Sequence, residues 1–230
     1  MSAVTHPRAP ARRGATRPVS WWGRAWQRAV EESAYAEEDL RAARRLARGG
    51  AVGQVTVDAG SYVAAVAEGD DAWTVQGSCE TLSAAEWAMF TELVAAVAGR
   101  VGALLAGDLP HGLVEDAEES GLELLPYAGD LGSSCGCDAW VDPCRHALAV
   151  AHQVGWLLDR DPFVLLHLRG LTRERLLADL HALSAGREDA SGGAHGRDRD
   201  PDLAAAEDAA DRARRALALL EQGQPFDHLF

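Results

Sequence analysis

Three cysteines and one histidine lie within twelve residues, at Cys135, Cys137, Cys144 and His146. Zinc takes such a set in structural sites, where four protein ligands surround it as a tetrahedron. In an extended chain residues i and i+2 point the same way, so Cys135 and Cys137 can face one metal ion. On a helix, residues i and i+2 point about 200° apart, so Cys144 and His146 cannot both lie within a helix and face one metal. We therefore expect Cys144 in the turn before a helix and His146 in the first turn of that helix. Four protein ligands leave no open coordination position, which favours a structural role over catalysis.

The residues around the four ligands suit such a site. Asp142 and Pro143 are typical of the start of a helix. Three thiolates, one neutral imidazole and a dication sum to a charge of −1, which Arg145 could offset. Trp140 and the apolar helix that follows could shield the metal from water. The sequence therefore predicts one structural zinc ion (Zn²⁺) as the cofactor.

Two other interpretations and chance clustering stay open but less favoured. A disulfide would join residues too close in the chain to bridge easily, and it would need no histidine. A [2Fe–2S] cluster held by three cysteines and one histidine has a related pattern, C-x-C … C-x-x-x-H. Here the gap is shorter, the last pair is C-x-H, and no Asp-Gly follows the third cysteine.

The spacing C-x-C-x6-C-x-H resembles the SWIM zinc finger. Residues 135–147, Cys-Gly-Cys-Asp-Ala-Trp-Val-Asp-Pro-Cys-Arg-His-Ala, are similar to a bacterial, chiefly actinobacterial, family of SWIM zinc-finger proteins. Residues 21–26 resemble the Trp-Trp-Gly element of that family, and residues 159–166 resemble the stretch after its finger. The resemblance covers about residues 20 to 184. Asp138 and Arg145 differ from the residues common in relatives, without affecting ligation.

The resemblance implies a function. SWIM fingers as a family are thought to mediate contacts with DNA or with other proteins, and the bacterial relatives often accompany Swi/Snf-type DNA-dependent ATPases. The resemblance therefore implies a zinc-binding interaction module that is accessory to such an ATPase through protein–protein contacts.

The charge of the chain limits what it can bind. The net charge is −13, and residues 51–134 alone carry one arginine against fourteen acids, or −13. Residues 1–50 carry ten arginines and five acids, or +5. A chain this acidic is not drawn as a whole to phosphate backbones, so any nucleic-acid contact must be local. Protein contact is the favoured interpretation.

One local basic face is visible in the sequence. A predicted helix over 37–48 places four arginines at i, i+3, i+4 and i+7, namely Arg41, Arg44, Arg45 and Arg48. This face could hold phosphates, or it could complement the acidic region of the same chain. Direct nucleic-acid binding by this face, the Trp21–Trp26 cluster and the finger is therefore the alternative function. For the tryptophans themselves we favour a role in the core, and we expect His152 to be exposed or at the edge of the core.

The fold class predicted is α+β, with a small three-stranded antiparallel sheet packed by helices, then the zinc finger and a helical C-terminal part. Apolar runs predict the strands, and a capping box, Ser83 with Glu86, predicts one long helix over 84–106 that covers the sheet. A further strand is expected over 122–125, leading into the finger. The segments expected are a disordered tail (1–18), an α+β domain (19–121), the finger with its following helices (122–184), a flexible linker (185–201), and a helix with an apolar tail (202–230).

Several classes of function are disfavoured. The chain has no lysine, so it has no phosphate-binding loop of the G-x-x-x-x-G-K-[ST] type, and it has no H-E-x-x-H motif. We therefore expect no enzyme activity and no small-molecule substrate. No apolar run reaches the roughly 18 residues of a membrane span. Because thiolate ligands require a reducing compartment, we expect a cytoplasmic protein.

Overall fold

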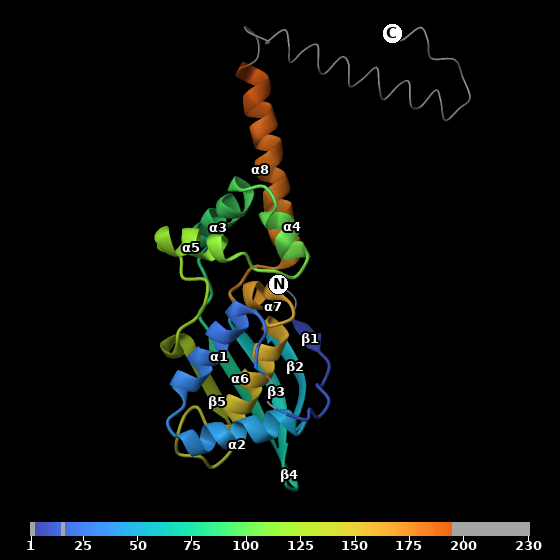
Figure 1. Ribbon diagram of the computed structural model, residues 1–230, viewed down its shortest axis with the longest axis vertical. Helices are drawn as coiled ribbons and strands as arrows, with labels where there is room; N and C mark the ends of the chain where they lie inside the picture. The colour runs from blue at the N-terminus through green and yellow to red at the C-terminus, as the bar shows by residue number, and fades with distance from the viewer. Residues whose placement is uncertain (1–2, 15–16, 195–230) are drawn as a thin grey trace, which may run out of the picture. The chain divides into compact units, whose positions relative to one another are not determined.

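The computed structural model describes residues 3–14 and 17–194, with side chains through residue 186 (Figure 1). The described residues up to His181 form one compact unit, in which the predicted segment 19–121 shares a hydrophobic core with the part of the predicted segment 122–184 that lies in this unit. A second unit begins at Ala182, and its described part is helical through residue 194.

The sheet of this unit is an antiparallel meander of five strands in the order β1-β2-β3-β4-β5. Three of the strands were predicted, and alternation of buried and exposed residues explains why they pair with one face on the core. The strand bounds are β1 Val4–His6, β2 Val52–Asp58, β3 Ser61–Glu68, β4 Asp71–Cys79 and β5 Leu131–Cys135.

The prediction of a three-stranded sheet is wrong, because each edge gains a strand. β1 lies within the tail that we expected to be disordered, and it pairs with β2 through Val4 opposite Val57. The Arg8 guanidinium also donates to the carbonyl of Gly50 (Nε–O distance 2.8 Å). The open edge of β2 supplies the partner that orders this segment, and a three-residue strand is too short for a sequence pattern to reveal.

The other added strand corrects the position of the finger. Residues 122–125, which we predicted as a strand, form none, although Leu122 and Leu124 are fully buried. The strand is β5, whose last residue, Cys135, lies opposite Val75 of β4. The finger therefore begins within the edge strand of the sheet, and it is not a separate element that follows the sheet.

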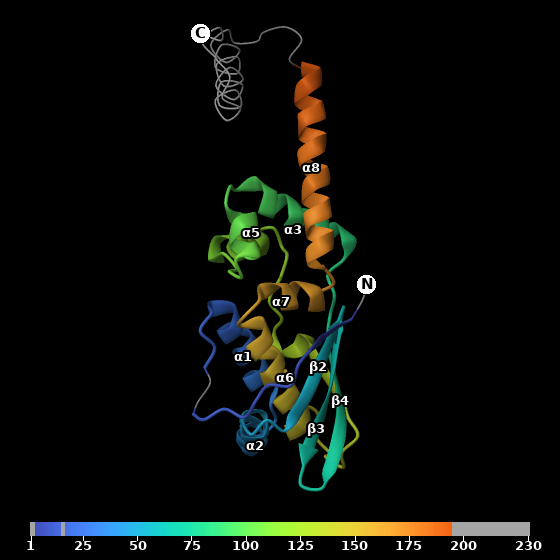
Figure 2. The ribbon, with the colours of Figure 1, turned by 90° about the vertical axis from the view of Figure 1, so that its right-hand side faces the viewer.

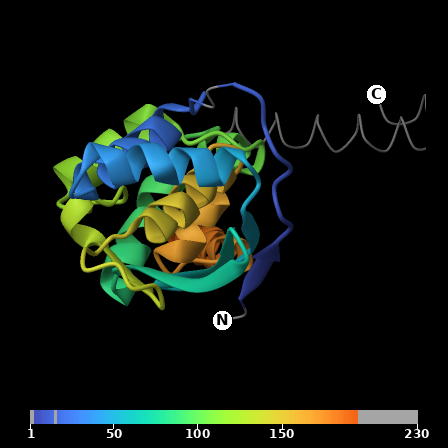
Figure 3. The same ribbon diagram turned by 90° about the horizontal axis from the view of Figure 1, so that it is seen from below.

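Three helices that contribute buried side chains to the core pack on one face of the sheet. Figures 2 and 3 show α6 (Arg145–Leu158) between the sheet and the pair α1 (Trp21–Ser33) and α2 (Glu37–Arg48). Trp26 of α1 is 1% exposed, and its indole N–H donates to the Ala151 carbonyl of α6 at 2.9 Å. A Cβ atom at Gly155 would stand 2.8 Å from the Trp26 ring, so glycine is needed for this close packing.

The predicted long helix is broken into two. The capping box is confirmed, since Ser83 and Glu86 exchange both hydrogen bonds at the start of α3 (Ala84–Ala96). The helix ends at Ala96, and α4 (Arg100–Leu105) begins after Gly99, whose φ of +91° is incompatible with a continuous helix. The prediction of one helix over 84–106 is therefore wrong at 97–99.

Shorter elements complete the described chain. They are α5 (His111–Glu119), the 3-10 turn η1 (Ala128–Asp130), α7 (Pro162–Leu168) and α8 (Arg173–Ala194). Because α8 reaches Ala194, the first part of the expected linker over 185–201 is helical instead of irregular. The rest of that linker and the predicted helix and apolar tail over 202–230 lie outside the described residues.

Candidate metal centre and arginine groove

The structure brings the four predicted ligands together. One ligand atom from each of Cys135, Cys137, Cys144 and His146 lies within 4.8 Å of the other three. The His146 Nδ1 atom is 3.8 Å from the Cys135 sulfur and 4.0 Å from the Cys144 sulfur. A zinc ion about 2.3 Å from sulfur and 2.1 Å from nitrogen requires edges of roughly 3.6 to 3.8 Å. The cluster could therefore hold a tetrahedral zinc ion after shifts of up to about 1 Å, and Nδ1 is the ring nitrogen that faces the cysteines.

The local backbone places these ligands as the spacing predicted. Cys135 ends β5, and Cys137 follows in the loop. Cys144 is the N-cap of α6, and His146 lies in its first turn, so both predicted positions are confirmed. Pro143 precedes the cap, and Asp142 does not cap the helix but is hydrogen-bonded to the Ser133 hydroxyl of β5. That contact ties the loop over 136–143 back to the sheet edge.

Glu68 is a part of the site that the sequence did not reveal. One of its carboxylate oxygens lies 2.8 Å from His146 Nε2, the ring nitrogen that faces away from the cysteines. Histidines that bind metals commonly donate their second N–H to a carboxylate, which fixes the tautomer and makes the ligand more basic. Glu68 lies 78 positions before His146 and ends β3. No local spacing could have linked the two.

Arg145 and Trp140, the two predicted neighbours of the site, make contacts that the sequence did not indicate. Arg145 reaches carboxylates, with its guanidinium 3.9 Å from Asp39 and 3.8 Å from Glu68. Trp140 does not shield the metal, because it is 84% exposed and its ring meets that of Tyr35 at a centroid distance of 5.6 Å. The aromatic ring that lies beside the site is that of Trp73 of β4, whose centroid is 6.0 Å from that of His146.

The thiols of the cluster influence one another. Burial is the largest single influence on each thiol, and it acts to raise the pKa. In Cys137, hydrogen bonds from the Ala139 backbone, His146 and the other thiols together outweigh burial and lower the pKa to about 7. The pKa of Cys135 rises to about 12, and that of Cys144 also rises. Three thiolates so close together need a cation to neutralise them, which is the chemistry that zinc supplies.

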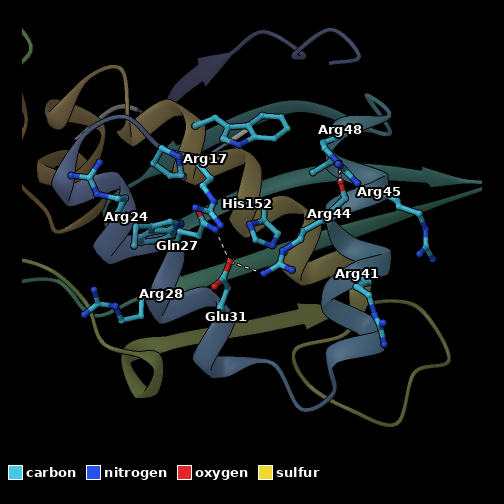
Figure 4. Close-up of a pocket in the computed structure, with 15 residues that line it drawn as sticks. Arg17, Arg24, Gln27, Arg28, Glu31, Arg41, Arg44, Arg45, Arg48 and His152 are labelled. Carbon is cyan, nitrogen blue, oxygen red and sulfur yellow. Dashed lines mark hydrogen bonds and ion pairs between the residues drawn. The ribbon is translucent and has the colours of Figure 1, made fainter. Parts of the chain in front are cut away.

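The predicted arginine face lies on a second feature, the arginine groove. This concavity of about 980 Å³ lies between α1 and α2 with α6 beneath it (Figure 4). All four predicted arginines line it, together with three that the prediction did not include. The seven are Arg17, Arg24, Arg28, Arg41, Arg44, Arg45 and Arg48.

The groove also contains buried residues. Trp26 and His152 line it, so the tryptophan belongs to the core and offers no exposed stacking surface. His152 is 9% exposed, and its Nε2 atom has no hydrogen-bond partner. Burial and then the nearby Arg44 lower its pKa to about 4, while Glu31 opposes them. His152 is therefore a buried neutral imidazole, where we had expected an exposed or core-edge one.

Comparison with known proteins agrees with the geometry of the cysteine cluster. Residues 117–155 match the family model described as SWIM zinc finger, a range that contains all four ligands. The chain is also 31% identical over 169 residues to the uncharacterized protein Rv2102 of Mycobacterium tuberculosis. That match covers 72% of this chain and 60% of the relative, so the chain spans well under the full length of that protein. No solved structure matches the chain.

One further finding concerns the helices. Among the described residues, no helix is both long and apolar enough to cross a membrane.

Proposed function

Because this chain carries a SWIM zinc finger, we propose that it is an interaction module in which one structural zinc ion holds a protein-binding surface in shape. By resemblance to the bacterial family, the proposed partner is a Swi/Snf-type DNA-dependent ATPase, to which this chain is accessory. SWIM fingers generally serve binding and not catalysis, and the proposal assigns no reaction to the chain. We propose that it acts in the cytoplasm, because thiolate ligands need a reducing compartment.

The observation that carries the proposal is the exposed aromatic pair, Tyr35 and Trp140. Tyr35, between α1 and α2, is 73% exposed, and Trp140 is 84% exposed. Tyrosine and tryptophan are enriched in the energetic centres of protein interfaces, where they bury large surfaces at low entropic cost. Trp140 lies in the loop between Cys137 and Cys144, so a metal that binds both ends of this loop fixes the tryptophan in place.

The test is a binding titration between the purified chain and the purified Swi/Snf-type ATPase of the same organism. Trp140→Ala is expected to weaken binding at least tenfold, the size of a typical hot-spot loss. Val97→Ala, which truncates a side chain that is 47% exposed and lies outside the finger, is the matched control and should bind like wild type. Binding that ignores Trp140→Ala would remove the aromatic pair from the proposal, and no binding by wild type would remove the partner.

Direct nucleic-acid binding is the second candidate, and the clustering of seven arginines in the arginine groove favours it. Phosphate binding falls steeply as salt rises, because it releases condensed counterions. The candidate predicts salt-sensitive binding of single- or double-stranded DNA that is lost when Arg41, Arg44, Arg45 and Arg48 are replaced. The absence of DNA binding at low ionic strength would eliminate it.

A further inference from the structure

The arginine groove concentrates positive charge in an acidic protein. The net charge of the chain is −13, yet seven of its 22 basic residues line this groove. The described lining contains one acidic residue, Glu31. Glu31 is already bound, since it lies 2.7 Å from Arg44 and 2.5 Å from Gln27. Arg44 also lies 3.8 Å from Glu37, and the other six arginines of the groove form no ion pair with any described carboxylate.

Four of the seven arginines have no partner among the residues that the structure describes. Arg24 donates to the Val19 carbonyl, Arg48 to the Arg44 carbonyl, and Arg44 pairs with Glu31. The side chains of Arg17, Arg28, Arg41 and Arg45 make no hydrogen bond or ion pair with any other described residue, and all four are exposed. Guanidinium groups grouped in this way repel one another, and an anion with several oxygens relieves the repulsion through forked hydrogen bonds.

The floor of the groove offers a polar group as well. Figure 4 shows His152 in the middle of the groove near Arg44 and Glu31, with Arg28 and Arg41 on opposite sides. The buried Nε2 atom of His152 lacks a partner, which costs free energy in a protein interior unless something occupies the site. The groove thus combines cations on both sides with an unsatisfied imidazole at its base.

We propose that the arginine groove binds a compact ligand bearing several phosphates, with its phosphates between the α1 and α2 arginines and one phosphate oxygen reaching His152. The volume of about 980 Å³ lies within the range of small-molecule sites. Opposite walls that both carry unpaired arginines favour a ligand with more than one phosphate over inorganic phosphate alone.

A nucleic-acid strand fits these observations less well. The groove reaches the core, since Trp26 and Ala47 line it and are each 1% exposed. A duplex contacts proteins through phosphates on its outer surface, which would meet the exposed arginines but not a histidine that is 9% exposed. The proposed occupant is instead a compact chain of phosphates that reaches in between the two helices. The ligand goes beyond the proposed protein-binding function, because it uses the groove and not Trp140.

The experiment is calorimetric titration of the zinc-loaded full chain with inorganic tripolyphosphate, ATP without magnesium, adenosine, and a twelve-nucleotide single strand, at low and moderate salt. We expect tripolyphosphate and ATP to bind and adenosine not to bind. The double variant Arg28→Ala/Arg41→Ala should weaken both at least tenfold. The matched control, Arg160→Ala/Arg173→Ala, removes two exposed arginines outside the groove and should change binding less than twofold.

A second measurement follows His152 itself. Tripolyphosphate brings negative charge to the imidazole, so it should raise the pKa of His152 from about 4 against the opposing effect of Arg44, as read by NMR titration. Three results would each overturn the proposal: no binding of tripolyphosphate at low salt, equal weakening by the two double variants, or an oligonucleotide that binds more tightly than ATP. Loss of binding to the ATPase in Trp140→Ala would leave this result unchanged, so the two proposals fail separately.

Discussion

The cysteine cluster and the arginine groove are built in opposite ways. The cluster takes its four ligands from twelve consecutive residues, and its ligands carry negative charge. The groove takes its arginines from α1, α2 and the segment before α1, and its floor from α6. One site is closed by its own short loop, whereas the other exists only when three elements pack together.

A short motif specifies the cysteine cluster, but no short motif specifies the arginine groove. A chelating set of soft ligands is recognisable from spacing because the metal demands a geometry that only a few spacings satisfy. A groove of like charges has no such demand, so its residues need only meet in space. Its ligand must therefore be inferred from unpaired groups, as at Arg28, Arg41 and His152.

The largest effect is expected at the cluster. Cys137→Ser removes one thiolate and with it tight zinc binding, so β5 and the start of α6 should lose their anchor. Structural zinc contributes on the order of 10 kcal/mol to folding in small fingers, and a large part of that should be lost here. Thermal unfolding and metal content measure the change. Ser134→Ala, which truncates an exposed side chain of β5 beside the site, is the control. A Cys137→Ser protein that keeps its metal and melts like wild type would contradict the ligand assignment.

A smaller effect is expected from His152 and tests the groove. Its pKa is about 4 in the folded state, lowered first by burial and then by Arg44, against an ordinary value of 6.5. Only the unfolded chain takes up a proton between these values, so stability rises with pH from about 4 to 6.5, by roughly 3 kcal/mol. Chemical denaturation of wild type and of His152→Gln across this pH range measures the difference between their free energies of unfolding. Zinc release at low pH affects both proteins alike, so it cancels in that difference. Parallel pH profiles would show that His152 does not titrate as described.

The smallest effect is expected at Glu68. Glu68→Gln keeps the shape but removes the charge that faces His146 Nε2, and loss of such a partner typically weakens metal binding 10- to 100-fold. Competition with a chromophoric zinc chelator measures the affinity. Glu80→Gln, an exposed glutamate elsewhere on the unit, should bind zinc like wild type. An unchanged affinity in Glu68→Gln would show that the cluster is as local as its spacing suggests, with no support from β3.

The sequence predicted well what depends on near neighbours. The position of Cys144 just before a helix and the capping box at Ser83 both follow from residues a few positions apart. The break at Gly99 was missed: we predicted one helix over 84–106, although the two glycines in Ala-Gly-Arg-Val-Gly are residues that interrupt a helical pattern. The resemblance to the SWIM zinc finger is confirmed over 117–155.

The rest depends on contacts between distant segments. Glu68 reaches His146 only because β3, β4 and β5 lie side by side, and β1 forms only because β2 has an open edge. The pairing of Trp140 with Tyr35 likewise joins a loop of the finger to the turn between α1 and α2. Arg24 and Arg28 are visible as an i, i+4 pair in the sequence, but their meeting with Arg41 across one groove requires the packing of both helices on α6.

The zinc assignment is tested most directly by the metal content of the purified chain, measured by inductively coupled plasma mass spectrometry under reducing conditions. We expect about one zinc ion per chain, and the charge-transfer absorption of three thiolate ligands when cobalt replaces the zinc. Iron in place of zinc, two or more zinc ions, or a metal-free chain with the same stability would contradict the zinc assignment.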